Sequence, residues 1–251
     1  MEVVRKINFE KIKKTISNTR LATYQNLNFP TDKFLLGKYI WNVKLSENFY
    51  FLLLNLEVAL RNSIYNAYLL HYPNKNFFYL YEKDLRQRHQ QRKELHSKGC
   101  WKMLCGVYFN LSKEEIVVSD GRLISELNFG FWTKFMFDNH YNIIWRTIFM
   151  DVFPHIETPQ SIDKSKRNLA YKIDKIRKFR NRIFHYEPIF NQNNLDEMHQ
   201  DIMDILGWID IDLQKLTILF DEYHKIKNEE TNIVEKLSNF GEKNEPSKQT
   251  I

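Results

Sequence analysis

The sequence predicts an all-α fold, and three observations support this. Only 7 of the 251 residues are Gly and 6 are Pro, which leaves little material for the turns of a many-stranded sheet. Hydrophobic residues make up 43% and aromatic residues 15%, as expected of a packed globular protein. The longest apolar segment, Phe49–Leu70, is interrupted by polar residues and fits a buried core helix better than a membrane span. No repeat or linker divides the chain, so we expect one domain over residues 1–240, followed by a polar, disordered tail over 241–251.

The elements follow from capping residues and helix breakers. Ser46 can cap a long helix, and Tyr72-Pro73 can end it. Pro188 disfavours helical geometry at the preceding residue, which places His185 in the last turn of its helix. The expected elements, in chain order, are short helices within 1–45 joined by a turn at 29–32, a helix over 46–71, a basic helical segment ending near 99, and helices over 141–153, 163–186 and 195–228, the last with a break at Gly207.

The segment 114–122 is compatible with two structures. Ile116–Gly121 could begin a small hairpin, or Ser119 could cap a helix from Asp120 to about Asn139. We favour the helix.

Positive charge is concentrated in two segments. The net charge is +6 and the pI about 9.1, which permits a polyanionic partner without requiring one. Between Lys164 and Arg182, nine Lys/Arg stand against one acid, Asp174. Between Lys83 and Lys102, seven Lys/Arg stand against two acids. Either segment could be a solvated helix face, but together they favour RNA as a partner.

The two cysteines, Cys100 and Cys105, have no partner at metal-ligand spacing, which favours a reduced cytoplasmic protein. The N-terminal residues contain no apolar signal segment, and we expect no membrane association. Phosphate-binding loops, nucleophile elbows and paired acidic motifs are not found, so we expect no cofactor and no metal.

The stretch Arg180-Asn181-Arg182-Ile183-Phe184-His185 gathers two guanidinium groups, a carboxamide and an imidazole. A histidine can transfer protons near neutral pH, and an arginine can stabilise charge on a phosphate. With a turn of ~100° per residue, Arg180 falls inside an apolar arc formed by Ile173, Ile176, Phe179, Ile183 and Phe184. An arginine at that position is costly unless an anion meets it. That anion could be a phosphate, or an internal acid such as Glu57 in a site without chemistry.

Polar residues lie along two other helical stripes. Arg177, Asn181 and His185 follow each other at i, i+4, i+8 on the border of the apolar arc. In the segment 49–70, Asn55, Asn62 and Asn66 share one stripe, while Glu57 and Arg61 form an i, i+4 pair. We expect one of the latter stripes to face the Arg177/Asn181/His185 edge, although hydrogen bonding between helices also accounts for each residue singly.

The sequence resembles the HEPN-domain ribonucleases, and within them the Abi-like proteins linked to bacterial abortive infection. The motif over 180–185 fits the R-N-x-x-x-H form of their R-x(4–6)-H pattern. Similar blocks are found in the same order over 55–62, 125–132, 180–191 and 206–210, so that the resemblance covers residues 35–225. Phe184 departs from the pattern, because a small residue is common there.

The resemblance implies an all-α, HEPN-type helical bundle with additional N-terminal and peripheral helices. It also implies metal-independent endoribonuclease activity in phage defence, a homodimer whose two motifs form one cleft, and a small noncoding RNA as a further partner. In the mechanism we expect, Arg180, Asn181 and His185 are catalytic. His185 is the general acid or base for attack of the ribose 2′-OH, and Arg180 stabilises the transition state by ~3–4 kcal/mol.

The remaining residues of the expected site have binding or supporting roles. Arg177, Lys178 and Arg182 would bind the RNA backbone. Glu57, Arg61 and Asn62 would support the catalytic groups. Two alternatives remain: an RNA-binding protein that does not cleave, and a protein-interaction module whose polar helix residues are structural.

Overall fold

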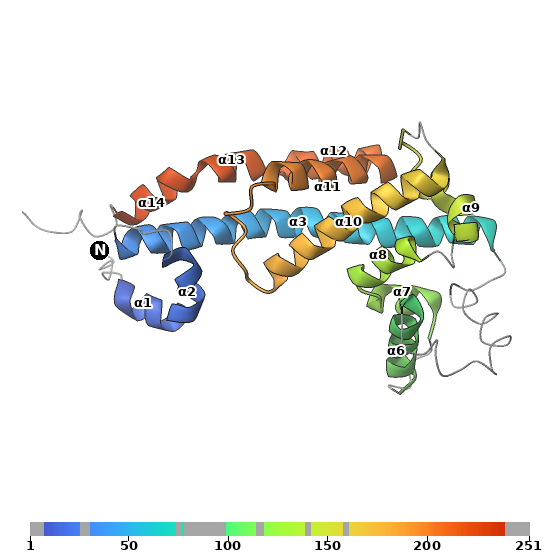
Figure 1. The fold of residues 1–251 in the computed structure, drawn as a ribbon, viewed down its shortest axis with the longest axis horizontal. Helices are drawn as coiled ribbons and strands as arrows, with labels where there is room; N and C mark the ends of the chain where they lie inside the picture. Colours follow the sequence, from blue (N-terminus) through green and yellow to red (C-terminus); the bar gives the residue numbers. More distant parts are fainter. Residues whose placement is uncertain are drawn as a thin grey trace, which may run out of the picture. The chain divides into compact units, whose positions relative to one another are not determined.

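The computed structural model describes residues 8–25, 31–73, 77, 99–113, 118–138, 142–157 and 161–238. All regular secondary structure within these ranges is α-helical, which confirms the all-α class (Figure 1). The chain divides into two compact units that share the helices α3 (Asp32–His71) and α10 (Ile162–Phe184). Unit 1 comprises residues 1–51, 182–195 and 221–251, and unit 2 comprises residues 52–181 and 196–220. The prediction of one domain over 1–240 stays a prediction.

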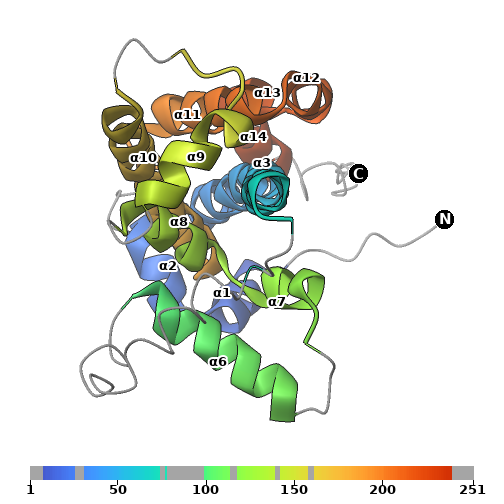
Figure 2. The ribbon, with the colours of Figure 1, turned by 90° about the vertical axis from the view of Figure 1, so that its right-hand side faces the viewer.

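Unit 1 is built around the first part of α3, which Figure 2 views nearly end-on. Its other helices are α1 (Phe9–Ile16), α2 (Asn18–Gln25), α13 (Tyr223–Asn228) and α14 (Glu230–Ser238). Leu21 and Tyr24 of α2 pack with Leu35 and Leu36 of α3 in one buried cluster. A side chain on Gly37 would meet Val234 Cγ2 at 2.7 Å, so this glycine permits the close approach of α3 and α14.

Two buried asparagines of α3 fasten loops of unit 1. Asn42 Oδ1 accepts hydrogen bonds from the backbone N–H groups of Ile189 (2.8 Å) and Phe190 (3.2 Å). Asn48 donates to Asp221 Oδ1 (2.9 Å) and accepts from the N–H of Glu222 (3.0 Å). Both asparagines are nearly inaccessible to solvent, which is tolerable because their polar atoms are paired.

Unit 2 is built around the second part of α3 and an aromatic core. Phe77, Phe131, Trp132 and Phe135 lie within contact distance of one another. The helices of this unit, besides parts of α3 and α10, are α6 (Cys100–Lys113), α7 (Asp120–Glu126), α8 (Phe129–Phe137), α9 (Asn142–Val152), α11 (Leu195–Ile209) and α12 (Ile211–Phe220).

The expected helix boundary at Ser46 is wrong. The helix α3 begins at Asp32 and passes through Ser46 without a break, so that Ser46 is not its N-cap. The reason lies in the burial pattern, because Leu35, Leu36, Trp41 and Leu45 are buried at helical spacing ahead of it. The sequence before Ser46 therefore continues the same buried face.

Two other predicted helices are each divided. Ser119 caps a helix as expected, with its hydroxyl accepting from the N–H of Arg122 (3.3 Å). That helix ends at Glu126, however, and Asn128 caps α8 by accepting from the N–H of Phe131 (3.2 Å). An Asn in this position competes with helix continuation because its side chain satisfies the first free N–H groups of a new helix.

The last helical region breaks at Asp210 and again at residues 221–222, and not at Gly207. Asp210 Oδ1 accepts hydrogen bonds from the N–H groups of Asp212 (2.8 Å) and Leu213 (2.9 Å), which starts α12. Gly207 lies within α11, where an added Cβ would meet the Gln214 side chain at 2.5 Å. This glycine permits close packing.

Several predicted segments lie outside the described residues: the turn at 29–30, the basic run from 83 to 98, the start of the alternative hairpin at 116–117, and the tail over 241–251. Within the described ranges, no helix combines the length and the apolar character needed to cross a membrane.

Candidate functional site

The division between the two units falls within the motif, between Asn181 and Arg182. In unit 1, the C-terminus of α10 is closed by a Schellman motif. The N–H of Glu187 donates to the carbonyl of Arg182 (2.8 Å), and the N–H of Tyr186 donates to the carbonyl of Ile183 (2.9 Å). Tyr186 adopts a positive φ of 58°, a conformation that glycine usually supplies. His185 is therefore the C-cap residue of α10.

The side chain of Arg182 stabilises this turn through a hydrogen bond and an ion pair. Its Nη2 donates to the carbonyl of Pro188 (3.1 Å), and its Nη1 lies 3.3 Å from Glu187 Oε2. A guanidinium that holds carbonyl oxygens after the last helical residue also opposes the negative end of the helix dipole. Arg182, expected on the RNA backbone, thus has a structural position in this turn.

The side chain of His185 is exposed, whereas Ile183 is buried. The helical angle predicts Phe184 within the apolar arc, but this residue is 39% exposed and packs on Tyr50 with ring centroids 5.3 Å apart. The arc ends at Ile183, because the helix ends one residue later.

In unit 2, an acid meets Arg180, as the apolar arc required. Its Nη2 lies 3.7 Å from Glu57 Oε2, and both side chains are about three-quarters buried. Burial raises the pKa of Glu57, and the opposing charge of Arg180 and a backbone hydrogen bond from Phe129 do not fully offset this. A hydrogen-bonded pair of charges is usually ~2.7–2.9 Å apart, so this pair is loose.

Arg177 and Lys178, expected on RNA, share one carboxylate. Asp174 lies 2.8 Å from Arg177 Nη2 and 2.9 Å from Lys178 Nζ. Burial acts to raise the pKa of Asp174, but the hydrogen bonds from Lys178 and Arg177 outweigh it and lower this pKa. The Lys178 side chain remains 69% exposed and can reach a polyanion.

The supporting residues on α3 separate. Glu57 meets Arg180, whereas Asn55 donates to Thr217 of α12 (3.2 Å) and Asn62 is exposed. Arg61 Nη1 donates to the carbonyl of Ser125 at 3.5 Å. Its Nε is buried without a hydrogen-bond partner in the described part of the chain. The Glu57 stripe is therefore the one that faces α10, while Asn181 is half-buried on α10.

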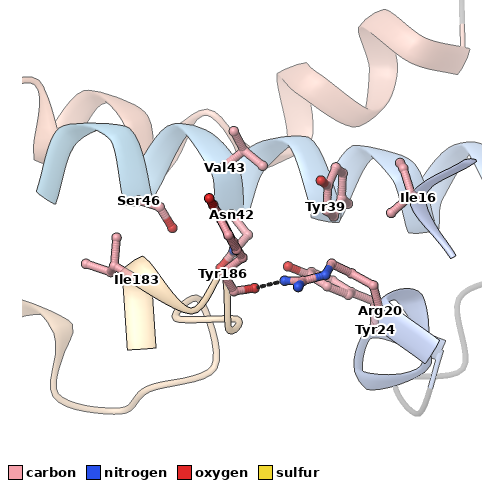
Figure 3. A pocket seen from close by; sticks show the side chains of 9 residues that line it. All are labelled: Ile16, Arg20, Tyr24, Tyr39, Asn42, Val43, Ser46, Ile183 and Tyr186. Carbon is pink, nitrogen blue, oxygen red and sulfur yellow. Dashed lines mark hydrogen bonds between the residues drawn. The ribbon is translucent and has the colours of Figure 1, made fainter. Parts of the chain in front are cut away.

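Sequence reasoning missed a pocket of about 310 Å³ in unit 1. Residues of three segments line it, namely Ile16, Arg20, Tyr24, Tyr39, Asn42, Val43, Ser46, Ile183 and Tyr186 (Figure 3). Arg20 Nη1 donates to the carbonyl of Tyr186 (2.5 Å), and the guanidinium lies 5.4 Å from the centre of the Tyr186 ring. The spacing of Tyr39, Val43 and Ser46 places them on one face of α3. This face could not be recognised while the helix was expected to begin at Ser46.

No group of three or more His, Cys, Asp or Glu side chains within the described ranges could hold a metal ion. The chain was also compared with known proteins. No family model, no curated protein and no solved structure matches it.

Proposed function

We propose that this protein is a metal-independent endoribonuclease. His185 acts as general base or general acid when the ribose 2′-OH attacks the adjacent phosphate. Arg180 stabilises the charge of the transition state, and Asn181 orients the imidazole or the phosphate. The products carry a 2′,3′-cyclic phosphate and a 5′-hydroxyl, and DNA is not cleaved because it lacks the 2′-OH.

The observation that carries this proposal is the exposed His185 at the C-cap of α10, directly after the stretch that holds Arg180 and Asn181. The hydrogen-bonded turn at the helix terminus fixes where the backbone of His185 lies. The exposed ring can meet a large substrate such as RNA, which a buried histidine could not.

The loose Arg180–Glu57 pair supports the role of Arg180. Glu57 holds the guanidinium in place at a distance of 3.7 Å, longer than a saturated charge pair. A phosphate group offers two anionic oxygens to the planar guanidinium, which makes it a strong competitor for Arg180. Of the other residues expected to support the site, Arg61 contacts the carbonyl of Ser125 and Asn62 is exposed, so Glu57 alone of the three is paired with a group proposed to be catalytic.

Arg177, Lys178 and Arg182 bind the RNA backbone in this proposal. The pairing of Arg177 and Lys178 with Asp174 means that RNA must compete with an internal carboxylate. Each phosphate that these cations neutralise releases counterions from the RNA, so binding should weaken as salt increases.

The decisive experiment incubates the purified chain with total RNA in EDTA and compares wild type with His185→Ala. General acid–base catalysis contributes about 10²–10⁴-fold, so cleavage by the variant should fall by that factor. The matched control is His155→Ala, because His155 is also exposed and its backbone N–H, not its side chain, donates to the carbonyl of Trp208. Cleavage that disappears in EDTA, or that survives in His185→Ala, contradicts the proposal.

A second candidate is an RNA-binding protein without cleavage activity. The pairing of Arg177, Lys178 and Arg180 with internal acids favours it over catalysis, because these ion pairs give the three cations a role that requires no reaction. In that case RNA binds in a salt-dependent manner, His185→Ala binds equally well, and wild type yields no cyclic phosphate ends. A module that only binds proteins would show no RNA affinity at low salt.

The resemblance to Abi-like HEPN proteins extends the proposal to phage defence in the cytoplasm, with a noncoding RNA as a further partner. It also predicts a homodimer, in which two copies of the 180–185 motif form one composite cleft. Sedimentation analysis of the purified chain tests the dimer, and a monomer at micromolar concentration that still cleaves RNA contradicts the composite cleft.

A further inference from the structure

The pocket of unit 1 is adjacent in sequence and in structure to the proposed general acid or base. Tyr186, which directly follows His185, forms part of its wall, and Ile183 forms another part. The fixed Schellman turn determines where the Tyr186 ring and carbonyl lie relative to the helix end. A molecule that contacts Tyr186 in this pocket therefore lies near the backbone of His185, the residue directly before it.

The size of the pocket limits what can occupy it. A volume of about 310 Å³ lies at the lower end of the ~300–1,000 Å³ found for small-molecule sites. This is room for a single nucleotide unit. A base-paired duplex cannot enter, so a nucleic-acid ligand must present an unpaired residue.

The chemistry of the wall matches a nucleobase attached to a phosphate. Aromatic rings of Tyr39 and Tyr186 provide surfaces of the kind on which bases stack. Arg20 supplies a positive charge, and none of the nine lining side chains is a carboxylate. An anionic ligand with a flat, apolar ring is favoured over a cationic or a purely aliphatic one.

Polar groups are placed to recognise the edge of a base. Asn42 Oδ1 accepts hydrogen bonds from the backbone N–H groups of Ile189 and Phe190, which fixes the orientation of the carboxamide. Its NH₂ group is then the part that can donate to a base. The Ser46 hydroxyl, visible on the Ile183 side of the pocket in Figure 3, can donate or accept. Burial raises the pKa of Tyr24, so its phenol stays a donor.

We infer that this pocket receives the unstacked base of the nucleotide next to the scissile phosphate, and that it sets the nucleotide preference of cleavage. The inference rests on the proposed ribonuclease function. The base enters between Tyr39 and Tyr186, while the sugar–phosphate remains outside beside His185. Single-stranded RNA is then the substrate class, because only an unpaired base can turn into the pocket.

The first test measures nucleotide binding and needs no cleavage. Saturation-transfer NMR follows the four ribonucleoside 5′-monophosphates with the full chain, and ribose 5-phosphate is the control without a base. At least one nucleotide should bind through its base protons, and ribose 5-phosphate should not displace it. Binding of no nucleotide, or equal binding of ribose 5-phosphate, overturns the inference.

A matched pair of variants locates the binding. Val43 and Ile40 lie one turn apart on α3 and are 43% and 40% exposed, but only Val43 lines the pocket. Val43→Trp fills the pocket and should weaken nucleotide binding at least tenfold, whereas Ile40→Trp should change it less than twofold. Ser46→Ala, which removes one hydroxyl without adding volume, should change the ranking of the four nucleotides. Equal effects of both tryptophans overturn the inference.

The second test maps cleavage sites on RNA of random sequence. Wild type and Ile40→Trp should share a preference at one position flanking the cut, and Val43→Trp should lose it. His185-dependent cleavage without nucleotide binding, or with the same preference in Val43→Trp, overturns this inference alone. If wild type cleaves no RNA, the proposed function fails, and the inference fails with it.

Discussion

The residues before and after the boundary at 181/182 are held in opposite ways. On the unit 2 side, Arg177, Lys178 and Arg180 are paired with the carboxylates of Asp174 and Glu57. On the unit 1 side, backbone hydrogen bonds fix the turn after α10, and the ring of His185 is exposed. The difference shows that charge positions the groups proposed to meet phosphate, while backbone geometry positions the group proposed to move protons.

The largest expected effect tests the backbone geometry. In Asn42→Ala, the N–H groups of Ile189 and Phe190 lose their acceptor near the buried side of unit 1. Leaving buried donors unsatisfied should reduce the free energy of unfolding by about 2–4 kcal/mol. Urea denaturation measures this, with the exposed Asn62→Ala as control, which should stay within about 0.5 kcal/mol of wild type. Equal effects would mean that Asn42 does not hold the turn.

The next effect tests the charge pairing. Arg180→Ala leaves Glu57 largely buried without the opposing guanidinium, and should reduce the free energy of unfolding by about 1–3 kcal/mol. This is below the cost for a fully buried pair, because each side chain keeps some contact with solvent. Adding Glu57→Gln should recover most of the loss, and a double-mutant cycle gives the coupling. An additive double variant contradicts the pairing.

A smaller effect concerns RNA affinity. Asp174→Asn removes the carboxylate that Arg177 and Lys178 share, so both cations become available to phosphate. RNA should bind about 2–5-fold more tightly at low salt, with a steeper salt dependence. The control is Asp212→Asn, which changes the net charge equally at a 91% exposed site beside Lys215. A gain of the same size in both variants would indicate a general charge effect.

The smallest effect is a contrast in pH dependence. The folded state raises the pKa of Glu57 above its ordinary value of 4.5, so this group contributes stability below pH 4.5 that is lost as pH rises through the folded pKa. It lowers the pKa of Asp174 below its ordinary 3.8, so that group contributes stability above pH 3.8 that is lost as pH falls.

The corresponding variants separate these two contributions. The wild type should lose some free energy of unfolding as pH rises above about 4.5, and Glu57→Gln should not show this loss. The wild type should also lose some as pH falls below about 3.8, and Asp174→Asn should not show that loss. Urea titrations at a series of pH values measure both. Slopes of the same sign contradict the contrast.

The all-α class and the buried face of α10 could be predicted from the sequence, because helical spacing determines which residues are buried. Ile173, Ile176, Phe179 and Ile183 are all buried, and Arg180 meets an acid. The start of α3 could not be predicted from the sequence, because Ser46 is a residue type favoured at N-caps. The helix extends back to Asp32 because its earlier residues form a buried face within unit 1.

Only the part of the candidate site that lies on the single helix α10 could be predicted from the sequence. The spacing of Arg180 and His185 follows from the helical geometry of α10. That Asp174 pairs with both Arg177 and Lys178 depends on side-chain conformations, which the sequence does not give. The pocket required residues of α1, α2, α3, the end of α10 and the turn after it to come together. Those contacts join positions more than a hundred residues apart, such as Arg20 and Tyr186.

Tyr186 has a consequence for engineering. A tyrosine at a φ of 58° carries backbone strain that glycine would relieve, and replacements of this kind commonly stabilise a protein by a fraction of a kcal/mol. A stability-guided redesign would choose glycine here and, by removing one wall of the pocket, would trade function for stability. Variants of this protein selected only for heat resistance should acquire glycine at position 186. If they also lose nucleotide binding, the strained Tyr186 is kept for the proposed ligand.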